Sequence, residues 1–133
     1  MNYVIDFKIW GDFLKVELSG TYPLDKFNKI TRDIDEVIDA NGITRVMVDL
    51  RRFEGRFGVF DGIHHIEKFR TESKYIQFAI LDVPENKTNN DFFENASFNR
   101  GYKIMFFYTE DEARNWLKLE FDNEPHMILV KEY

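Results

Sequence analysis

The feature that most constrains the fold is a change in hydrophobic period along the chain. Residues 3–18 alternate apolar and polar side chains around a break at Gly11-Asp12, which predicts two antiparallel strands joined by a tight turn. Beyond Gly20, amphipathic segments with helical spacing alternate with short, almost continuously apolar runs, which are typical of strands covered on both faces. This order predicts an α/β fold with a mixed, mostly parallel sheet and right-handed crossovers.

Capping residues and glycines set the expected boundaries. Thr109 and Glu112 stand three apart, as a capping box requires, and predict that a helix begins there. Gly62 weakens another predicted helix by about 1 kcal/mol relative to alanine. The tail 121–133 contains four consecutive apolar residues, which predict a last strand, either at a sheet edge or in a dimer contact. The other predicted elements are helices at 23–41, 59–74, 91–100 and from 109, strands at 3–10, 13–18, 43–50, 75–83 and 102–108, and a polar loop at 84–90.

Length and composition point to a single domain and exclude several partners. The chain has 133 residues, 44% of them hydrophobic, so we expect one domain over 1–133 with its core at about 3–120. A formal charge of -6 has the wrong sign for a protein held to phosphates, so no nucleic-acid partner is expected. The sequence has no cysteine, and no apolar run approaches the roughly 18 residues of a membrane span. We therefore expect a cytoplasmic protein without a membrane span.

Three short patterns, together with the element order, resemble the SpoIIAA-like or STAS superfamily. The first is the run at 46–51, a strand ending in Asp-Leu before a glycine-containing loop. The second is the run 93–101, which ends in Asn99-Arg100-Gly101 before a strand, and the third is Glu112-Ala113 followed by Trp116-Leu117 in the last helix. The resemblance implies a SpoIIAA-like fold of about five strands and about four helices, and the group includes relatives compared with the CRAL-TRIO lipid-transfer fold.

The resemblance also implies a regulatory, non-catalytic role, with one departure. In the anti-sigma-factor antagonists of this superfamily, a serine or threonine after the Asp-Leu strand is phosphorylated to switch partner binding. Here neither residue type occurs between Arg51 and His65, and the nearest hydroxyl is that of Thr71. We therefore predict that this phosphorylation switch is absent.

Charged residues at predicted strand ends form a candidate polar site. Ligands in open α/β sheets tend to bind beyond the carboxyl ends of parallel strands, so a rim is expected from Asp49, Arg51, Arg52 and Asp82. Such a rim could support acid-base chemistry, and the alternative is a row of solvated charges. His64 and His65 are adjacent, so on a helix their side chains diverge by about 100° and cannot grip one ion alone. No catalytic residue, metal or cofactor is expected.

Aromatic residues around the glycine-containing loop form a second candidate site. Phe53, Phe57 and Phe60 lie in or beside this loop with Arg56, and His64 follows on the next predicted helix. The rings are either folded onto that helix or exposed as a contact patch.

Three functional hypotheses follow from these two candidate sites and the composition. The first is a module that binds a regulatory protein or a second copy of itself through this aromatic loop. The second is a carrier of a small apolar ligand, suggested by the fourteen phenylalanines and the lipid-transfer relatives. The third is an enzyme that uses the acidic rim.

Overall fold

A β-hairpin starts the fold as predicted. The computed structural model describes residues 2–23, 27–119 and 123–133, and the side chains of residues 27, 59, 60 and 63 lie outside this description. Strand β1, Tyr3–Trp10, pairs antiparallel with β2, Phe13–Thr21, around a turn in which Gly11 has a φ of 57°. Every second side chain of β1 is buried, from Tyr3 to Ile9.

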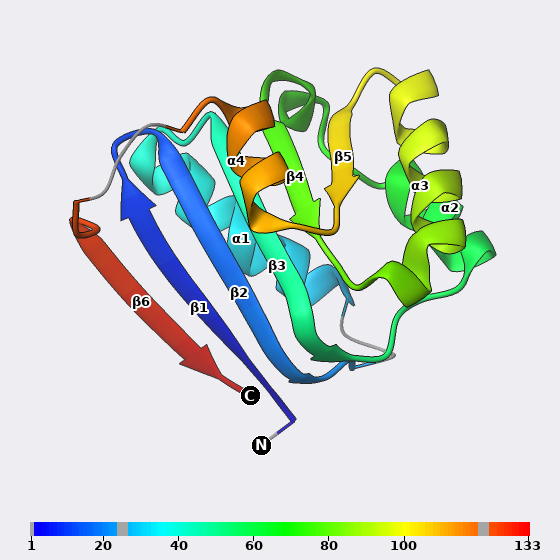
Figure 1. The fold of residues 1–133 in the computed structure, drawn as a ribbon, viewed down its shortest axis with the longest axis horizontal. Helices are drawn as coiled ribbons and strands as arrows, with labels where there is room; N and C mark the ends of the chain where they lie inside the picture. Colours follow the sequence, from blue (N-terminus) through cyan, green and yellow to red (C-terminus); the bar gives the residue numbers. More distant parts are fainter. Residues whose placement is uncertain (1, 24–26, 120–122) are drawn as a thin grey trace.

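The sheet is mixed and mostly parallel, which confirms the predicted class. Strands β2, β3 (Arg45–Glu54), β4 (Gln77–Leu81) and β5 (Lys103–Phe107) run parallel to one another. The tail adds β6, Met127–Glu132, antiparallel to β1, so the described sheet has six strands instead of about five. Their order is β5-β4-β3-β2-β1-β6, which places β6 at one edge (Figure 1).

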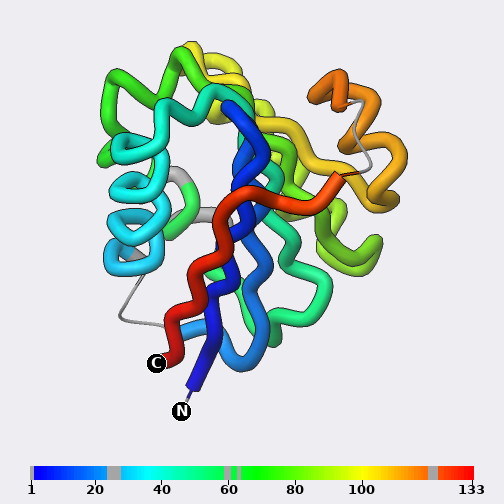
Figure 2. Tube along the Cα trace, turned by 90° about the vertical axis from the view of Figure 1, so that its left-hand side faces the viewer, coloured from blue at the N-terminus to red at the C-terminus, as the bar shows by residue number. Residues whose placement is uncertain are grey.

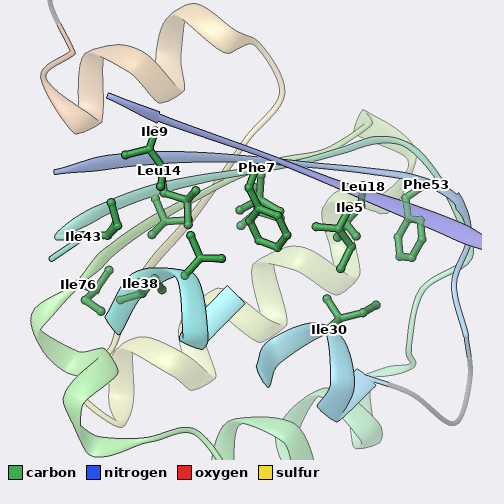
Figure 3. Packing of buried hydrophobic residues seen from close by; sticks show 14 of the residues in the cluster. Ile5, Phe7, Ile9, Leu14, Leu18, Ile30, Ile38, Ile43, Phe53 and Ile76 are labelled. Carbon is green, nitrogen blue, oxygen red and sulfur yellow. The ribbon is translucent and has the colours of Figure 1, made fainter. Parts of the chain in front are cut away.

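Helices cover the two faces of the sheet unequally. Ile30 and Ile38 from one helix pack on the buried residues of β1, as Figure 3 shows. Ile66 and Phe93 from two further helices pack on the same face beside Ile80. The fourth helix packs on the opposite face, against Phe13, Met47 and Ala79. In chain order these helices are α1 (Phe27–Asn41), α2 (Val59–Glu67), α3 (Lys87–Asn99) and α4 (Glu110–Leu117). None of the helices in the described residues is long and apolar enough to cross a membrane.

Two predicted boundaries were wrong, one where the apolar pattern is weak and one where a tertiary contact replaces a local signal. The helix predicted at 59–74 ends at Glu67, and a separate 3-10 turn follows over Thr71–Tyr75, because this polar stretch has no apolar stripe to bury. The polar loop predicted at 84–90 is a 3-10 turn, Pro84–Asn86, followed directly by α3. Asn90, in the first turns of α3, is buried because its amide bonds to the preceding strand end.

The capping prediction is confirmed for α4. The Thr109 hydroxyl accepts a hydrogen bond from the Glu112 backbone N–H at 3.3 Å, and the helix begins at Glu110. The same hydroxyl donates to Glu112 Oε1 at 2.9 Å.

Candidate functional site

An apolar cavity of about 180 Å³ lies between the sheet and the layer formed by α1, α2 and α3. Its floor is made of side chains from the four parallel strands β2 to β5, and its roof comes mainly from α1, α3 and the loop before α2. The lining includes Val48, Leu50, Ile80, Ile34, Phe57 and Phe93. Most of the wall consists of carbon atoms, so the cavity offers little to hydrogen-bond with water.

The pleat of the strands explains why these side chains meet. Successive residues of a strand point to opposite faces, and β3 and β4 pair with Val48 beside Ile80. These two side chains, with Leu50 two residues further along β3, therefore face the helices, while Met47 and Ala79 face α4.

Gly62 makes room for a ring beside the cavity. A Cβ on Gly62 would lie 3.0 Å from Cε2 of Phe57 and 3.1 Å from Cδ2 of Phe93. Gly62 weakens the helix, but the absence of a side chain at this position lets both rings pack against α2. The ring centroids of Phe57 and Phe93 are 5.6 Å apart, and that of Tyr22 is 6.2 Å from Phe57.

The described rings of the aromatic loop point inward. Phe53 is only 7% exposed and packs edge-on against Tyr3 and Tyr22. Phe57 lines the cavity and packs against His65. Of the two placements the sequence left open, Phe57 shows the folded one, against α2, whereas Phe53 is buried against Tyr3 and Tyr22 instead of α2. The side chain of Phe60 lies outside the described residues, and His64 is exposed on α2.

An ion pair with a buried carboxylate lies at the end of the cavity nearest the carboxyl ends of the strands. Asp82, at 1% exposure, accepts hydrogen bonds from Arg56 Nη2 at 2.7 Å, Asn90 Nδ2 at 2.9 Å and the Val83 backbone N–H at 2.7 Å. Burial alone would raise the pKa of Asp82, but these donors outweigh it and hold the pKa below its ordinary value.

Arg56 also fastens the loop between β3 and α2. Its Nη1 donates to the Phe53 carbonyl at 2.6 Å and to the Gly55 carbonyl at 2.5 Å, and its Nη2 donates to the Leu50 carbonyl at 2.7 Å. Together with Asp82, these acceptors engage all three guanidinium nitrogens, because Nε approaches the carboxylate at 3.4 Å. The arginine is therefore committed to holding the cavity end.

The structure does not bring the predicted rim together. Asp49 lies on the face of the sheet that α4 covers, beside Met47. Asp82 contacts Arg56 and Asn90 on the face that α1, α2 and α3 cover, so the sheet separates the two carboxylates. Asp49 instead pairs with Arg51 at 2.9 Å. Burial tends to raise the pKa of Asp49, but the hydrogen bonds from Arg51 hold it below its ordinary value. Arg52 is exposed.

The shared acid-base chemistry proposed for the rim therefore has no geometric basis in these two carboxylates. Within the described ranges, no group of three histidines, aspartates or glutamates is placed to hold a metal ion.

Sequence reasoning missed several residues of this site. Tyr22, Ile34 and Asn90 all line the cavity but lie on three separate elements. One local signal existed, because Asn86 and Asn90 are four apart and both amides reach Asp82. Side chains at this spacing share one helix face. The residue that both amides bond to, Asp82, lies earlier in the chain at the end of a strand, so the spacing alone does not identify it.

The solved structures that are similar to this fold include the following two. One is an anti-sigma factor antagonist from Mycobacterium paratuberculosis, with a TM-score of 0.57 at 14% identity over 88% of this chain and 95% of that chain. The other is an uncharacterised protein with a SpoIIAA-like fold from Shewanella loihica, with a TM-score of 0.54 at 16% identity over 87% of this chain and 93% of that chain. No protein-family model matches the sequence, and no curated protein matches it. The sheet, the helices and these two likenesses together give the chain a SpoIIAA-like (STAS) fold.

Proposed function

We propose that this domain is a non-catalytic STAS-like module that binds a small apolar ligand in the cavity beneath α1, α2 and α3. The observation that carries the proposal is the cavity itself, with about 180 Å³ and a wall of mostly carbon atoms. Protein interiors hold few voids larger than a water molecule. An apolar cavity of roughly 150 Å³ stays dry and takes up benzene.

The wall also defines the class of ligand. Rings of Phe57, Phe93 and Tyr102 line it, so a ring or a short branched chain meets mostly carbon. The one arginine in the lining has its guanidinium engaged by protein acceptors, so it offers no donor to an anion. Asp35, the carboxylate in the lining, is paired with Arg70 at 3.2 Å. The ligand we propose is therefore uncharged, with roughly six to ten non-hydrogen atoms by comparison with benzene in a slightly smaller cavity.

The test uses a probe of this class and a variant that fills the cavity. Titration with benzene or indole, followed by NMR, is expected to give saturable shifts at cavity residues. Ile80→Phe adds a ring to the floor and is expected to weaken probe binding at least tenfold. Lys103→Phe places the same ring at an exposed position of β5 that does not line the cavity, and it serves as the control. Thermal unfolding of both variants checks that they fold.

The same protein taken directly from cells supplies an independent readout. Native mass spectrometry followed by solvent extraction is expected to release a neutral apolar compound from the wild type and much less from Ile80→Phe. If neither probe binds saturably and extraction yields no such compound, the proposal is wrong.

A regulatory protein-binding module is a second candidate. It is supported by the fold that this chain shares with a protein named an anti-sigma factor antagonist. Because 52–64 contains no serine or threonine, such binding here would not depend on phosphorylation of the loop after β3. The exposed residues Arg52 and His64 are the described candidates for the contact surface on this side. Under this second proposal, the protein acts in the cytoplasm.

Charge reversal tests the second candidate. Arg52→Glu with His64→Glu is expected to abolish association with a partner that has been identified by cross-linking in cells, while probe binding in the cavity stays unchanged. If a partner is found and the double variant binds it as the wild type does, this surface is not the contact.

A further inference from the structure

Strand β6 is an edge strand with an unusually apolar surface. It pairs with β1 on one side, and no described segment lies beyond it on the other (Figures 1 and 2). Its residues Met127, Ile128, Leu129 and Val130 are between 40% and 60% exposed. Both faces of the strand are apolar here, because neighbouring residues point to opposite sides.

The outer edge of β6 has free main-chain groups at defined positions. Tyr3 and Tyr133 exchange both backbone hydrogen bonds, at 3.0 and 2.9 Å. Hydrogen-bonded pairs alternate with non-hydrogen-bonded pairs along an antiparallel ladder. The main-chain groups of Ile128, Val130 and Glu132 therefore point away from β1, toward the open edge.

The opposite edge of the sheet is protected, and β6 is not. On β5, the Phe106 backbone N–H donates to Glu94 Oε2 of α3 at 2.8 Å, so a side chain caps that edge. Natural edge strands are usually shielded by charges, prolines, bulges or covering segments. In β6 the register with β1 has no bulge, and the run 127–130 contains neither charge nor proline.

We propose that β6 pairs with β6 of a second copy of this chain, antiparallel, with Leu129 opposite Leu129 of that copy. A twofold axis perpendicular to the sheet then joins two six-stranded sheets into one. Ile128 lies opposite Val130 of the second copy in both halves, and these are the residues whose outward main-chain groups can exchange hydrogen bonds. The Lys131 stem packs on Met127 of that copy.

Charge decides the register. With Leu129 on the axis, Glu132 lies opposite His126. The His126 Nδ1 accepts from the Gly11 backbone N–H at 3.3 Å, which leaves Nε2–H to donate to the facing carboxylate. Moving the axis to Ile128 sets Glu132 against Glu124 of the second copy. Moving it to Val130 sets Glu132 against Ile128, so both shifts lose the complementary pair.

The interface is small, so association is weak. A single pair of six-residue strands falls below the roughly 1,200 Å² of a standard interface, which suggests a Kd of about 100 µM. Sedimentation velocity across a concentration series that spans this value is expected to show a monomer–dimer equilibrium for the wild-type protein.

Charge swaps at the axis test both the surface and the register. Leu129→Lys and Leu129→Glu each place like charges opposite each other and are expected to remain monomeric. An equimolar mixture of the two is expected to regain dimers, because lysine then faces glutamate. Phe98→Lys, at a residue 76% exposed on α3, is the matched control and is expected to dimerise as the wild type does.

A second variant addresses the main chain. Val130→Pro removes an outward N–H and leaves the bonds to β1 in place, so it is expected to weaken the dimer at least tenfold while circular dichroism stays native. The proposal is overturned if the wild type is monomeric at about ten times the expected Kd. It is also overturned if the mixture of the two charged variants stays monomeric.

Discussion

Replacing Arg56 by methionine is the sharpest test of how the cavity end is held. Asp82 would keep its bonds from Asn86, Asn90 and the Val83 N–H but lose its charged partner at 2.7 Å, in a place with 1% exposure. Removing one partner of a buried ion pair costs about 3–5 kcal/mol. Because three donors remain, we expect the lower end, a loss of about 3 kcal/mol in the free energy of unfolding at pH 7.

The predicted loss of stability in Arg56→Met can be measured as a lower Tm. For a chain of 133 residues, an unfolding entropy of about 2.1 cal/mol/K per residue converts this loss into a Tm lower by about 10 °C. Urea unfolding followed by circular dichroism measures the free energy directly. Arg52→Met, at an exposed neighbouring arginine, is the matched control and is expected to stay within about 0.5 kcal/mol of the wild type.

The pH dependence distinguishes a lost ion pair from simple repacking. The native pKa of Asp82 lies below its unfolded value, so its contribution to stability is full above the unfolded pKa and is lost as pH falls through the native pKa. Without Arg56 the native pKa rises, since burial is the largest cause acting on it. The difference between wild type and variant is therefore largest at pH 7, and it shrinks as the pH falls from the raised native pKa of the variant toward the lowered native pKa of the wild type.

A double-mutant cycle closes the argument. Arg56→Met combined with Asp82→Asn removes the stranded charge, so the two losses are expected to fall short of additivity by at least about 1 kcal/mol. A loss below about 1 kcal/mol for Arg56→Met, or a loss of equal size at pH 3.5 and pH 7, would refute the reasoning.

Three further substitutions test local features by urea unfolding. Thr109→Ala removes the cap that accepts from Glu112 N–H and is expected to cost about 1 kcal/mol; an unchanged midpoint would contradict this. Tyr133→Phe removes the hydroxyl that donates to the buried Asp33 at 2.7 Å and is expected to cost about 1.5–3 kcal/mol, and a neutral result would mean that water replaces the bond. Gly20→Ala puts a Cβ into the backbone of β1 at a φ of 98° and is expected to cost more than about 2 kcal/mol, whereas stabilisation would show that the hairpin end shifts freely.

Local patterns determined most of the secondary structure and the fold class. The alternation in β1 and β2, the apolar runs of β3 to β5 and the cap at Thr109 each depend on residues within a few positions of one another. Where the pattern was weak, as in the polar stretch before β4, the predicted helix was too long. The tail 121–133 carried the signal for β6, but its place beside β1 depends on a pairing more than 110 residues apart.

The sequence alone could therefore specify the strands, the helices and the mixed sheet, because hydrophobic period and capping are written in neighbouring residues. Only the tertiary structure decided that Arg56 reaches Asp82, that Asp49 and Asp82 lie on opposite faces, and that rings from separate elements surround a cavity. These outcomes depend on which elements stack on which face and on how completely their side chains fill the space between them, and no local pattern encodes that packing.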